Sequence, residues 1–251
     1  MFRPTALIPI FDHGSTIASV VEPLRSLGLP CRIVDDGSAA STKEQLEALR
    51  RRFDDTQVWT LERNGGKGAA LRVGFERVAE QGFTHAVVLD ADGQHDVGDV
   101  PRFLRAAERH PTALILGSPV FGDDAPAARL YGRKISQVWV HIETLSRAID
   151  DPLCGFRCYP VRETLHVFRT QGFGARMDFD PEIAVRLAWS GSQMLNVRTR
   201  VQYPRGGLSH FRMGRDNLAI SWMHTKLVLE MLTRIPSLFA RRRPLRLEEQ
   251  A

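Results

Sequence analysis

The sequence predicts an α/β protein built on a mostly parallel central sheet that is flanked by helices. From residue 5 to residue 117, short β-rich runs alternate with helical patterns, which is typical of parallel βαβ units. The runs IVDD and VVLD begin with consecutive apolar residues, as expected for strands buried on both faces. Polar clusters follow several of these strands, and ligands bind at that edge of open α/β sheets.

The expected elements alternate regularly through the first half of the chain. Strands are expected at residues 5–10, 31–36, 57–61, 85–90 and 112–117, and helices at 16–27, 42–53, 66–82 and 100–110. The second half is expected to hold a long helix at 129–149, a turn-rich segment at 151–160, a helix at 180–191, a strand at 193–203 and a last helix at 216–235. Because no linker or repeat is visible, we expect one domain over residues 1–235 and a basic tail over 236–251.

The composition is that of an ordinary folded protein. Of 251 residues, 43% are hydrophobic and 25% are charged, and the formal net charge is +5. This charge is compatible with a nucleotide, an anionic lipid surface or nucleic acid as a partner. No basic stretch is interleaved with aromatic residues in the manner of nucleic-acid-binding motifs, so we expect no nucleic-acid partner.

Cysteine usage and hydropathy indicate the compartment. The three cysteines form no C-x-x-C pair, so neither a disulfide framework nor a zinc site is expected, and a cytoplasmic location fits best. The N-terminal apolar run is broken by Pro9 and Asp12, unlike a signal peptide. No stretch reaches about 20 uninterrupted apolar residues, so we expect no membrane span.

Three polar clusters are expected to meet at one edge of the sheet. Asp12 follows the first strand, Asp35 and Asp36 follow the second, and the stretch DADGQH from Asp90 to His95 follows the fourth. Each cluster alone has the composition of a turn. Together they place several carboxylates at one edge, where like charges repel unless a cation joins them.

The DADGQH stretch fits a divalent metal ion. Asp90 and Asp92 are separated by one small residue, and Gln94 adds a neutral carbonyl oxygen. Hard cations such as Mg²⁺ and Mn²⁺ prefer oxygen ligands and often share them with substrate phosphates. The spacing excludes an EF-hand, which needs a longer ladder of acidic residues and a glutamate at its twelfth position.

The stretch RNGGKGAALRVG, residues 63–74, is glycine-rich and leads into a helix. It is not a Walker A loop, because Gly68 follows Lys67, and it is not a dinucleotide-binding fingerprint, because Leu71 stands in the third glycine position. The helix N-terminus and Lys67 would suit an anion. An ordinary helix start explains the same residues equally well.

An ordered set of motifs now carries a resemblance. IPIFDHGSTI, IVDDGS, NGGKGAALRVGF, VVLDADGQHD, DPLCGFRCYP and FDPEIAVRLAWSG occur in this order between residues 5 and 203. The set resembles the family 2 glycosyltransferases, and within them the branch that is similar to dolichyl-phosphate mannosyltransferase. The resemblance implies a nucleotide-diphospho-sugar transferase fold of the GT-A type, an inverting sugar transfer and a Mg²⁺ or Mn²⁺ ion that bridges the donor diphosphate.

The resemblance also implies roles for particular residues. The expected metal ligands are Asp90, Asp92 and Gln94. The residues expected to contact the nucleotide-sugar donor are Pro9, Asp12, Asp35, Asp36, Lys67, Asp90 and Arg212. The residues expected in catalysis are Asp151, Arg133 and Arg157.

The nature of the acceptor decides what the catalytic residues do. A hydroxyl acceptor would need a carboxylate base, for which Asp151 matches the family better than Asp150. A phosphate acceptor is already an anion and needs no base, so Arg133 and Arg157 would hold it. An N-cap or turn before Pro152 is an equally good explanation of Asp151.

The chain also departs from its relatives. They usually read P-x-Y-N-E after the first strand, and here Asp12 and His13 occupy the last two positions, so the nucleotide base stays open. The loop at 203–217 contains His210, Arg212 and Arg215, which would meet donor phosphates or lie on a plain surface loop.

The C-terminal helix has two interpretations. Ile220, Met223, Leu227 and Met231 share one face, which favours a last helix packed on the domain. The alternative is a peripheral contact of this helix and the Arg-rich tail with an anionic membrane, which would bring the site to a lipid-linked acceptor. A second functional class, a non-catalytic subunit that binds a nucleotide sugar and recruits partners at a membrane, also remains open at the level of sequence.

Overall fold

The computed structural model describes residues 1–121, 127–201, 213–241 and 245–248, and only the backbone of residues 127–129, 213 and 215. Its centre is an eight-stranded sheet in the order β3-β2-β1-β4-β6-β5-β7-β8. The strands are β1 (Pro4–Ile10), β2 (Cys31–Asp35), β3 (Thr56–Thr60), β4 (His85–Val88), β5 (Leu114–Phe121), β6 (Arg157–Pro160), β7 (Met194–Val201) and β8 (Arg246–Leu247). Every pairing is parallel except those of β6, so the prediction of a mostly parallel sheet is confirmed.

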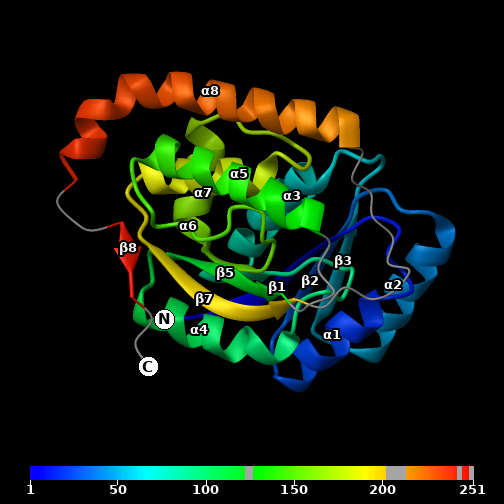
Figure 1. The fold of residues 1–251 in the computed structure, drawn as a ribbon. Helices are drawn as coiled ribbons and strands as arrows, with labels where there is room; N and C mark the ends of the chain where they lie inside the picture. The colour runs from blue at the N-terminus through cyan, green and yellow to red at the C-terminus, as the bar shows by residue number, and fades with distance from the viewer. Residues whose placement is uncertain (122–126, 202–212, 242–244, 249–251) are drawn as a thin grey trace.

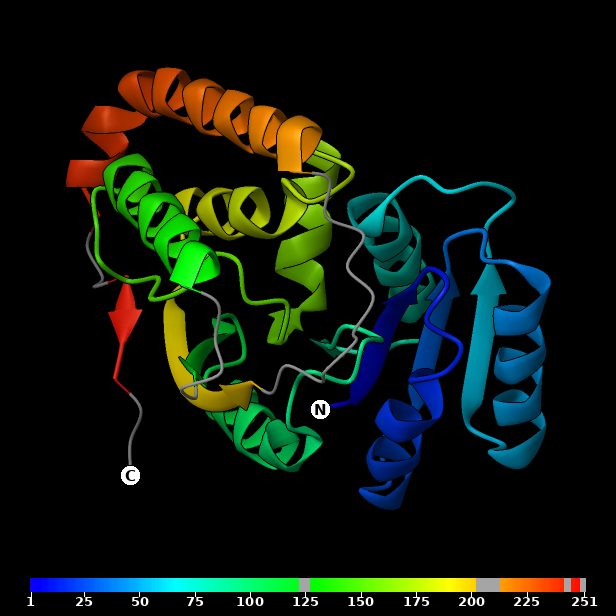
Figure 2. The same ribbon diagram turned by 45° about the vertical axis from the view of Figure 1, so that its right-hand side comes forward.

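Helices cover both faces of this sheet (Figure 1). Packed on one face are α1 (Ile17–Ser26), α2 (Ala40–Arg52), a short 3-10 turn (Val97–Asp99) and α4 (Val100–Arg109). Packed on the other are α3 (Lys67–Glu80), α5 (Ala127–Thr144), α6 (Val161–Thr170), α7 (Phe179–Trp189) and α8 (Met213–Phe239). The turned view in Figure 2 shows α8 lying outermost, across α5 and α7.

Helix α1 buries the face that its apolar spacing predicts. In α1, Ile17, Val20, Val21 and Leu24 recur at intervals of three and four residues and are all buried. Burying such a side chain stabilises the fold by about 1.5–3 kcal/mol. The strands between the two helical layers are apolar on both sides because each side contacts helices.

Strand β6 is the largest difference from the expected topology. We expected residues 151–160 to be turn-rich, but residues 157–160 form a strand that pairs antiparallel with β4 and β5. In this register Arg157 lies opposite Val88, the last residue of β4. The reversed direction carries the preceding loop, residues 151–156, to the edge where β4 ends, and so next to the DADGQH stretch.

The C-terminal segment packs on the domain. Met223 and Leu227 of α8 are fully buried, which confirms the packed interpretation of the inner face. The helix continues through Pro236 to Phe239, and β8 pairs with β7, so parts of the predicted tail contribute to the helix and the sheet. Among the described residues, none of the helices combines the length and apolar character needed to cross a membrane.

Candidate functional site

The centre of the site is a lysine held between two carboxylates. Lys67, the first residue of α3, places its Nζ 2.7 Å from Asp90 Oδ1 and 2.7 Å from Asp180 Oδ2. Asp90 follows β4 and Asp180 lies in the first turn of α7. The ion pairs therefore join three elements that are far apart in the sequence.

Partial burial makes these charges strongly dependent on one another. Burial disfavours the charged form of Lys67, but Asp180 and Asp90 together hold its pKa above the usual range. Burial likewise opposes ionisation of Asp90, yet Lys67 and then His95, whose Nε2 lies 3.8 Å away, hold the pKa of Asp90 below its usual range. Asp90 is thus a permanent anion at neutral pH.

The pKa of Asp92 is shifted in the opposite direction to that of Asp90. Burial and then the neighbouring Asp90 carboxylate raise its pKa above the ordinary value, and the nearby His95 and His13 offset only part of this rise. Its Oδ1 accepts a hydrogen bond from the backbone amide of Gln94 at 3.0 Å. Between the two acids, the Ala91 carbonyl accepts a hydrogen bond from Thr16 Oγ1 at 2.6 Å, so the start of α1 fixes the loop.

Gly155 lets the loop before β6 close onto these charges. A Cβ at this position would overlap the Asp90 carboxylate and would lie 2.7 Å from Lys67 Nζ. Any side chain would have to displace the ion pair. The glycine of the DPLCGFR motif is therefore explained by close approach of the backbone to Asp90.

Asp36 anchors the glycine-rich loop. Its two carboxylate oxygens accept hydrogen bonds from the backbone amides of Gly65 (2.8 Å) and Gly66 (2.7 Å). In the first turn of α3, the backbone amides of Gly68 and Ala69 both donate to the Ala175 carbonyl. The described contacts thus favour the ordinary helix start over an anion site at this helix N-terminus, with Lys67 engaged by carboxylates.

Asp35 and the residues after β1 complete the edge of the sheet. Asp35 is fully buried; its Oδ1 accepts from the Ser38 amide at 2.9 Å, and its Oδ2 has no hydrogen-bond partner among the described residues. Asp12 adopts a left-handed backbone (φ 55°) and accepts from the Ala39 amide at 2.8 Å. Pro9 is buried within β1, opposite Val34.

Asp151 forms both a turn and an ion pair. Arg133 of α5 donates from Nη1 to both Asp151 oxygens, at 2.8 and 2.6 Å, and the Leu153 amide donates to Oδ1 at 2.8 Å. The guanidinium of Arg133 also lies over the ring of Phe121, 5.2 Å from its centroid. Asp151 therefore forms the turn before Pro152 that was one of its two interpretations, and it is also the partner of Arg133. Their roles in catalysis stay predictions.

The guanidinium of Arg157 is enclosed by the protein and is not open to an acceptor ligand. Its side chain is fully buried and donates to the carbonyls of Cys154 (2.8 Å), Asp180 (2.6 Å) and Pro152 (2.7 Å). These bonds hold the loop before β6 against α7. We therefore correct the expectation that Arg157 holds the acceptor: this arginine positions the backbone around the site.

Two residues of the site were missed by sequence reasoning. Asp180 belongs to the FDPE motif, but nothing in its spacing indicated a contact with Lys67 across more than a hundred residues. His95 ends the DADGQH stretch and was assigned no contact, and its ring lies near both Asp90 and Phe156. The following Asp96 caps a 3-10 turn, and Asp99 pairs with Arg102.

Three residues of the predicted donor loop cannot be placed against the site. His210 and Arg212 lie outside the described residues, as does the side chain of Arg215. Their contacts with donor phosphates stay predictions.

The side chains that follow β4 have the donor atoms that a divalent metal ion prefers. Asp90, Asp92 and Gln94 offer oxygen donors, and burial together with the Asp90 carboxylate raises the pKa of Asp92. The described part of the chain holds no cluster of three or more histidine, cysteine or acidic ligands. The remaining ligands would have to be water and donor phosphates, as is usual for Mg²⁺.

Comparison with known proteins identifies the family. The family model described as glycosyl transferase family 2 matches residues 5–166. The chain belongs to this family. It is therefore a glycosyltransferase, and the resemblance found in the motifs is confirmed.

Relatives of this glycosyltransferase include proteins that act on lipid phosphates. An uncharacterized protein of Methanocaldococcus jannaschii is 22% identical over 92% of this chain and 96% of its own length. The dolichyl-phosphate β-glucosyltransferase of Saccharomyces cerevisiae is 23% identical over 80% of this chain and 62% of its own. The undecaprenyl-phosphate mannosyltransferase of Micrococcus luteus is 30% identical over 46% and 48%. The chain thus spans about half to two thirds of the length of these two named transferases.

Solved structures confirm the GT-A fold of the glycosyltransferase. Glucosyl-3-phosphoglycerate synthase of Mycobacterium tuberculosis, solved with Mn²⁺, UDP-glucose and phosphoglyceric acid, superposes with a TM-score of 0.62, 15% identity and coverage of 93% and 79%. TarS of S. aureus, solved with UDP-GlcNAc, gives 0.58, 14%, 91% and 67%. At these identities the likeness establishes the fold.

Proposed function

We propose that this glycosyltransferase is an inverting, divalent-metal-dependent enzyme that moves a sugar from a nucleotide-diphosphate donor to a lipid-linked phosphate. The observation that carries the proposal is the pair of carboxylates after β4. Asp90 is paired with Lys67, whereas burial and the Asp90 carboxylate raise the pKa of Asp92. A metal-diphosphate complex would bring positive charge to Asp92.

The proposed residues act by binding and orientation. Asp92, Asp90 and Gln94 would hold the Mg²⁺ or Mn²⁺ ion, which when bound stabilises the negative charge of the leaving diphosphate. Lys67 keeps Asp90 ionised for this task. Asp35, Asp36, Asp12 and Pro9 shape the edge at which the nucleoside would lie, and Arg212 remains a proposed donor contact.

The acceptor is proposed to be a phosphate rather than a hydroxyl. Asp151 is 7% exposed and is paired with Arg133, so it is poorly available as a general base. A phosphate oxygen is an anion before attack and needs no base, and Arg133 could exchange Asp151 for it. The relatives named for dolichyl and undecaprenyl phosphate support this choice. Peripheral contact with the cytoplasmic face of a membrane, through the C-terminal helix and Arg-rich tail, is part of the proposal.

Thermal unfolding in the presence of candidate donors tests the proposal. UDP-, GDP- and dTDP-sugars are compared with and without Mn²⁺, because a ligand that binds only the native state raises the melting temperature. We expect one nucleotide series to raise it, and to do so only with metal. If no nucleotide sugar changes the melting temperature in either condition, the proposed donor class is wrong.

A further inference from the structure

The outer surface formed by α5 and α8 exposes an unusual amount of apolar side chain. On α5 the exposed residues recur at intervals of three and four: Tyr131, Ile135, Val138, Ile142 and Leu145. On α8 the exposed residues recur at intervals of three, four and seven: Leu218, Trp222, Leu229, Leu232 and Phe239. Tyr131 is 70% exposed and Trp222 is 61% exposed. We call this surface the α5–α8 face.

Helices α5 and α8 are joined by contacts between Trp139, Glu143 and His224. The ring of Trp139 on α5 stacks on His224 of α8 with centroids 6.2 Å apart, and Trp139 is still 41% exposed. Beneath it, His224 Nδ1 lies 2.7 Å from Glu143 Oε1, and both residues are buried. The pair fixes α8 against α5, so the exposed stripes belong to one packed unit.

The charges that border the α5–α8 face are basic. Lys134 lies one helical turn from Tyr131 and Val138, and Lys226 lies one turn from Trp222 and Leu229. The acidic residues of the described parts of both helices are withdrawn from solvent or paired: Glu143 and Asp216 are buried, and Glu230 pairs with Arg186. A second copy of this face would bring lysines against lysines, whereas an anionic surface would match them.

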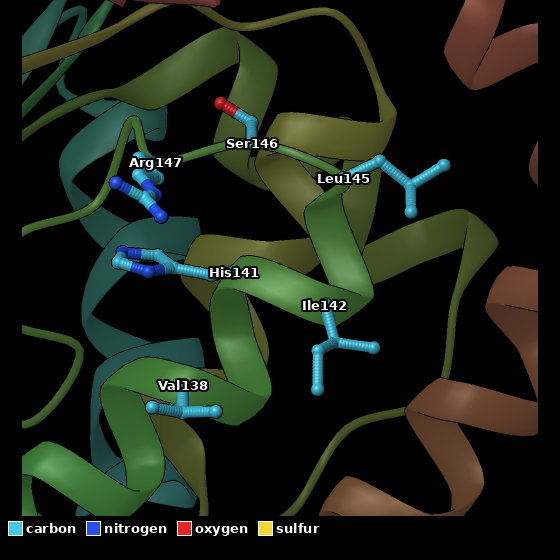
Figure 3. A pocket seen from close by; sticks show the side chains of 6 residues that line it. All are labelled: Val138, His141, Ile142, Leu145, Ser146 and Arg147. Carbon is cyan, nitrogen blue, oxygen red and sulfur yellow. The ribbon is translucent and has the colours of Figure 1, made fainter.

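A shallow groove lies at the far end of α5. It has a volume of about 450 Å³ and is lined by Val138, His141, Ile142, Leu145, Ser146 and Arg147. Figure 3 shows Ile142 and Leu145 projecting from one side of the helix and His141 and Arg147 from the other. The groove therefore joins the apolar stripe to an exposed guanidinium.

The near end of the stripe adjoins the catalytic residues. Arg133 follows Tyr131 by two positions and donates to Asp151. From Tyr131 to Leu145 the stripe covers about 21 Å at 1.5 Å per residue. An apolar surface of this length thus begins at the residue proposed to receive an acceptor phosphate.

We infer that the α5–α8 face docks on an anionic phospholipid bilayer, with the exposed apolar side chains in the headgroup region and the bordering lysines at lipid phosphates. Amphipathic helices with aromatic and aliphatic residues on one face and basic residues beside it bind such surfaces. The inference rests on the proposed lipid-linked acceptor and deepens it, because it names the docking surface as both helices together rather than the C-terminal segment alone.

Vesicle sedimentation tests this inference without donor, metal or turnover. The full chain is mixed with vesicles of phosphatidylcholine alone or with phosphatidylglycerol added, at low and high salt. We expect binding to the anionic vesicles that weakens at high salt. In the pair Trp222→Ser and Leu229→Ser, and in the pair Ile135→Ser and Val138→Ser, the partition coefficient should fall about tenfold or more.

The controls separate docking from folding and from the proposed function. Leu27→Ser removes a side chain that is 47% exposed at the end of α1, and it should bind vesicles as the unchanged chain does. All variants should keep the donor-induced rise in melting temperature, because the substituted side chains are exposed.

Three results would overturn the inference. The unchanged chain could fail to sediment with either vesicle, or the paired variants could sediment as well as the unchanged chain. Light scattering could instead show a dimer that the paired variants dissociate, which would make the face a contact between copies. If donor binding persists in any of these cases, only the docking surface is wrong and the proposed function stands.

Discussion

The ammonium of Lys67 lies 2.7 Å from Asp90 and 2.7 Å from Asp180, and so ties the loop after β4 to the first turn of α7 through the start of α3. One side chain thereby neutralises the first acid of the DADGQH stretch, while burial and the Asp90 carboxylate raise the pKa of Asp92. This difference between the two acids is the reason for proposing that Asp92 holds the metal.

Replacing Lys67 with methionine should destabilise the protein. The substitution leaves Asp90 and Asp180 as close carboxylates without their cation. We expect a loss of about 2–3 kcal/mol, below the range for a fully buried pair because the Asp90 side chain is 30% exposed. Urea unfolding measures the change, and Lys43→Met, at an exposed position on α2, serves as the control. Equal stability of Lys67→Met and the unchanged chain would contradict the assigned role.

Replacing Asp180 with asparagine should weaken metal binding more than it affects stability. Lys67 would then interact with Asp90 alone and compete with the ion for its oxygens. Loss of such an outer partner lowers metal affinity by about 10–100-fold. The Mn²⁺ concentration needed for half-maximal donor-dependent thermal shift measures this, with Glu76→Gln on the exposed face of α3 as the control. An unchanged Mn²⁺ requirement would mean that Asp180 only supports the fold.

The sequence was sufficient for the parts of the fold that depend on local periodicity. The alternating strands and helices as far as β5, the buried face of α8 and the location of the DADGQH stretch after β4 all follow from apolar spacing. The strand at residues 157–160 could not be predicted from the sequence, because the segment is short and its pairing partners, β4 and β5, are distant in the chain.

The roles of individual site residues were less predictable, because they depend on non-local contacts. From the sequence alone, an arginine in the glycine-containing motif DPLCGFRCYP is a reasonable candidate to bind a phosphate, and this was the prediction for Arg157. Only the antiparallel register of β6 shows that its guanidinium points into the protein, towards three carbonyls. Asp180 was missed for the same reason, since its partner Lys67 belongs to another motif.

Substitution of Arg157 should affect folding rather than acceptor binding. Arg157→Met removes the guanidinium donor from the carbonyls of Cys154 and Pro152, and each unsatisfied buried group costs about 1–3 kcal/mol. We expect a loss of at least about 2 kcal/mol in unfolding free energy. Arg133→Gln is the matched comparison, because it should cost about 2–3 kcal/mol by leaving the buried Asp151 without its cation and should also raise the KM for a polyprenyl-phosphate acceptor. A KM raised by Arg157→Met and unchanged by Arg133→Gln would restore Arg157 to the acceptor site.

The three cysteines should be inert in the native protein. Burial raises the pKa of Cys31 and Cys154 to about 12 and that of Cys158 still higher. The thiols therefore stay protonated at pH 8, and a thiol-reactive reagent should label none of them until denaturant is added. Because the folded state retains these protons above the ordinary thiol pKa of 9.0, the three thiols should lower stability as pH rises beyond 9. Rapid labelling of the native protein at pH 8 would contradict the burial of the thiols.

Release of nucleoside diphosphate from the donor tests the central claim most directly. The unchanged chain, Asp92→Asn and the nearby Asp96→Asn are compared across a Mn²⁺ titration and in excess chelator, with unfolding midpoints measured in parallel. We expect no release of nucleoside diphosphate in excess chelator and normal release by Asp96→Asn. For Asp92→Asn we expect the rate of release to fall about a hundredfold or more while the unfolding midpoint stays unchanged. Full release by Asp92→Asn, or by the unchanged chain in chelator, would contradict the proposed metal role of Asp92.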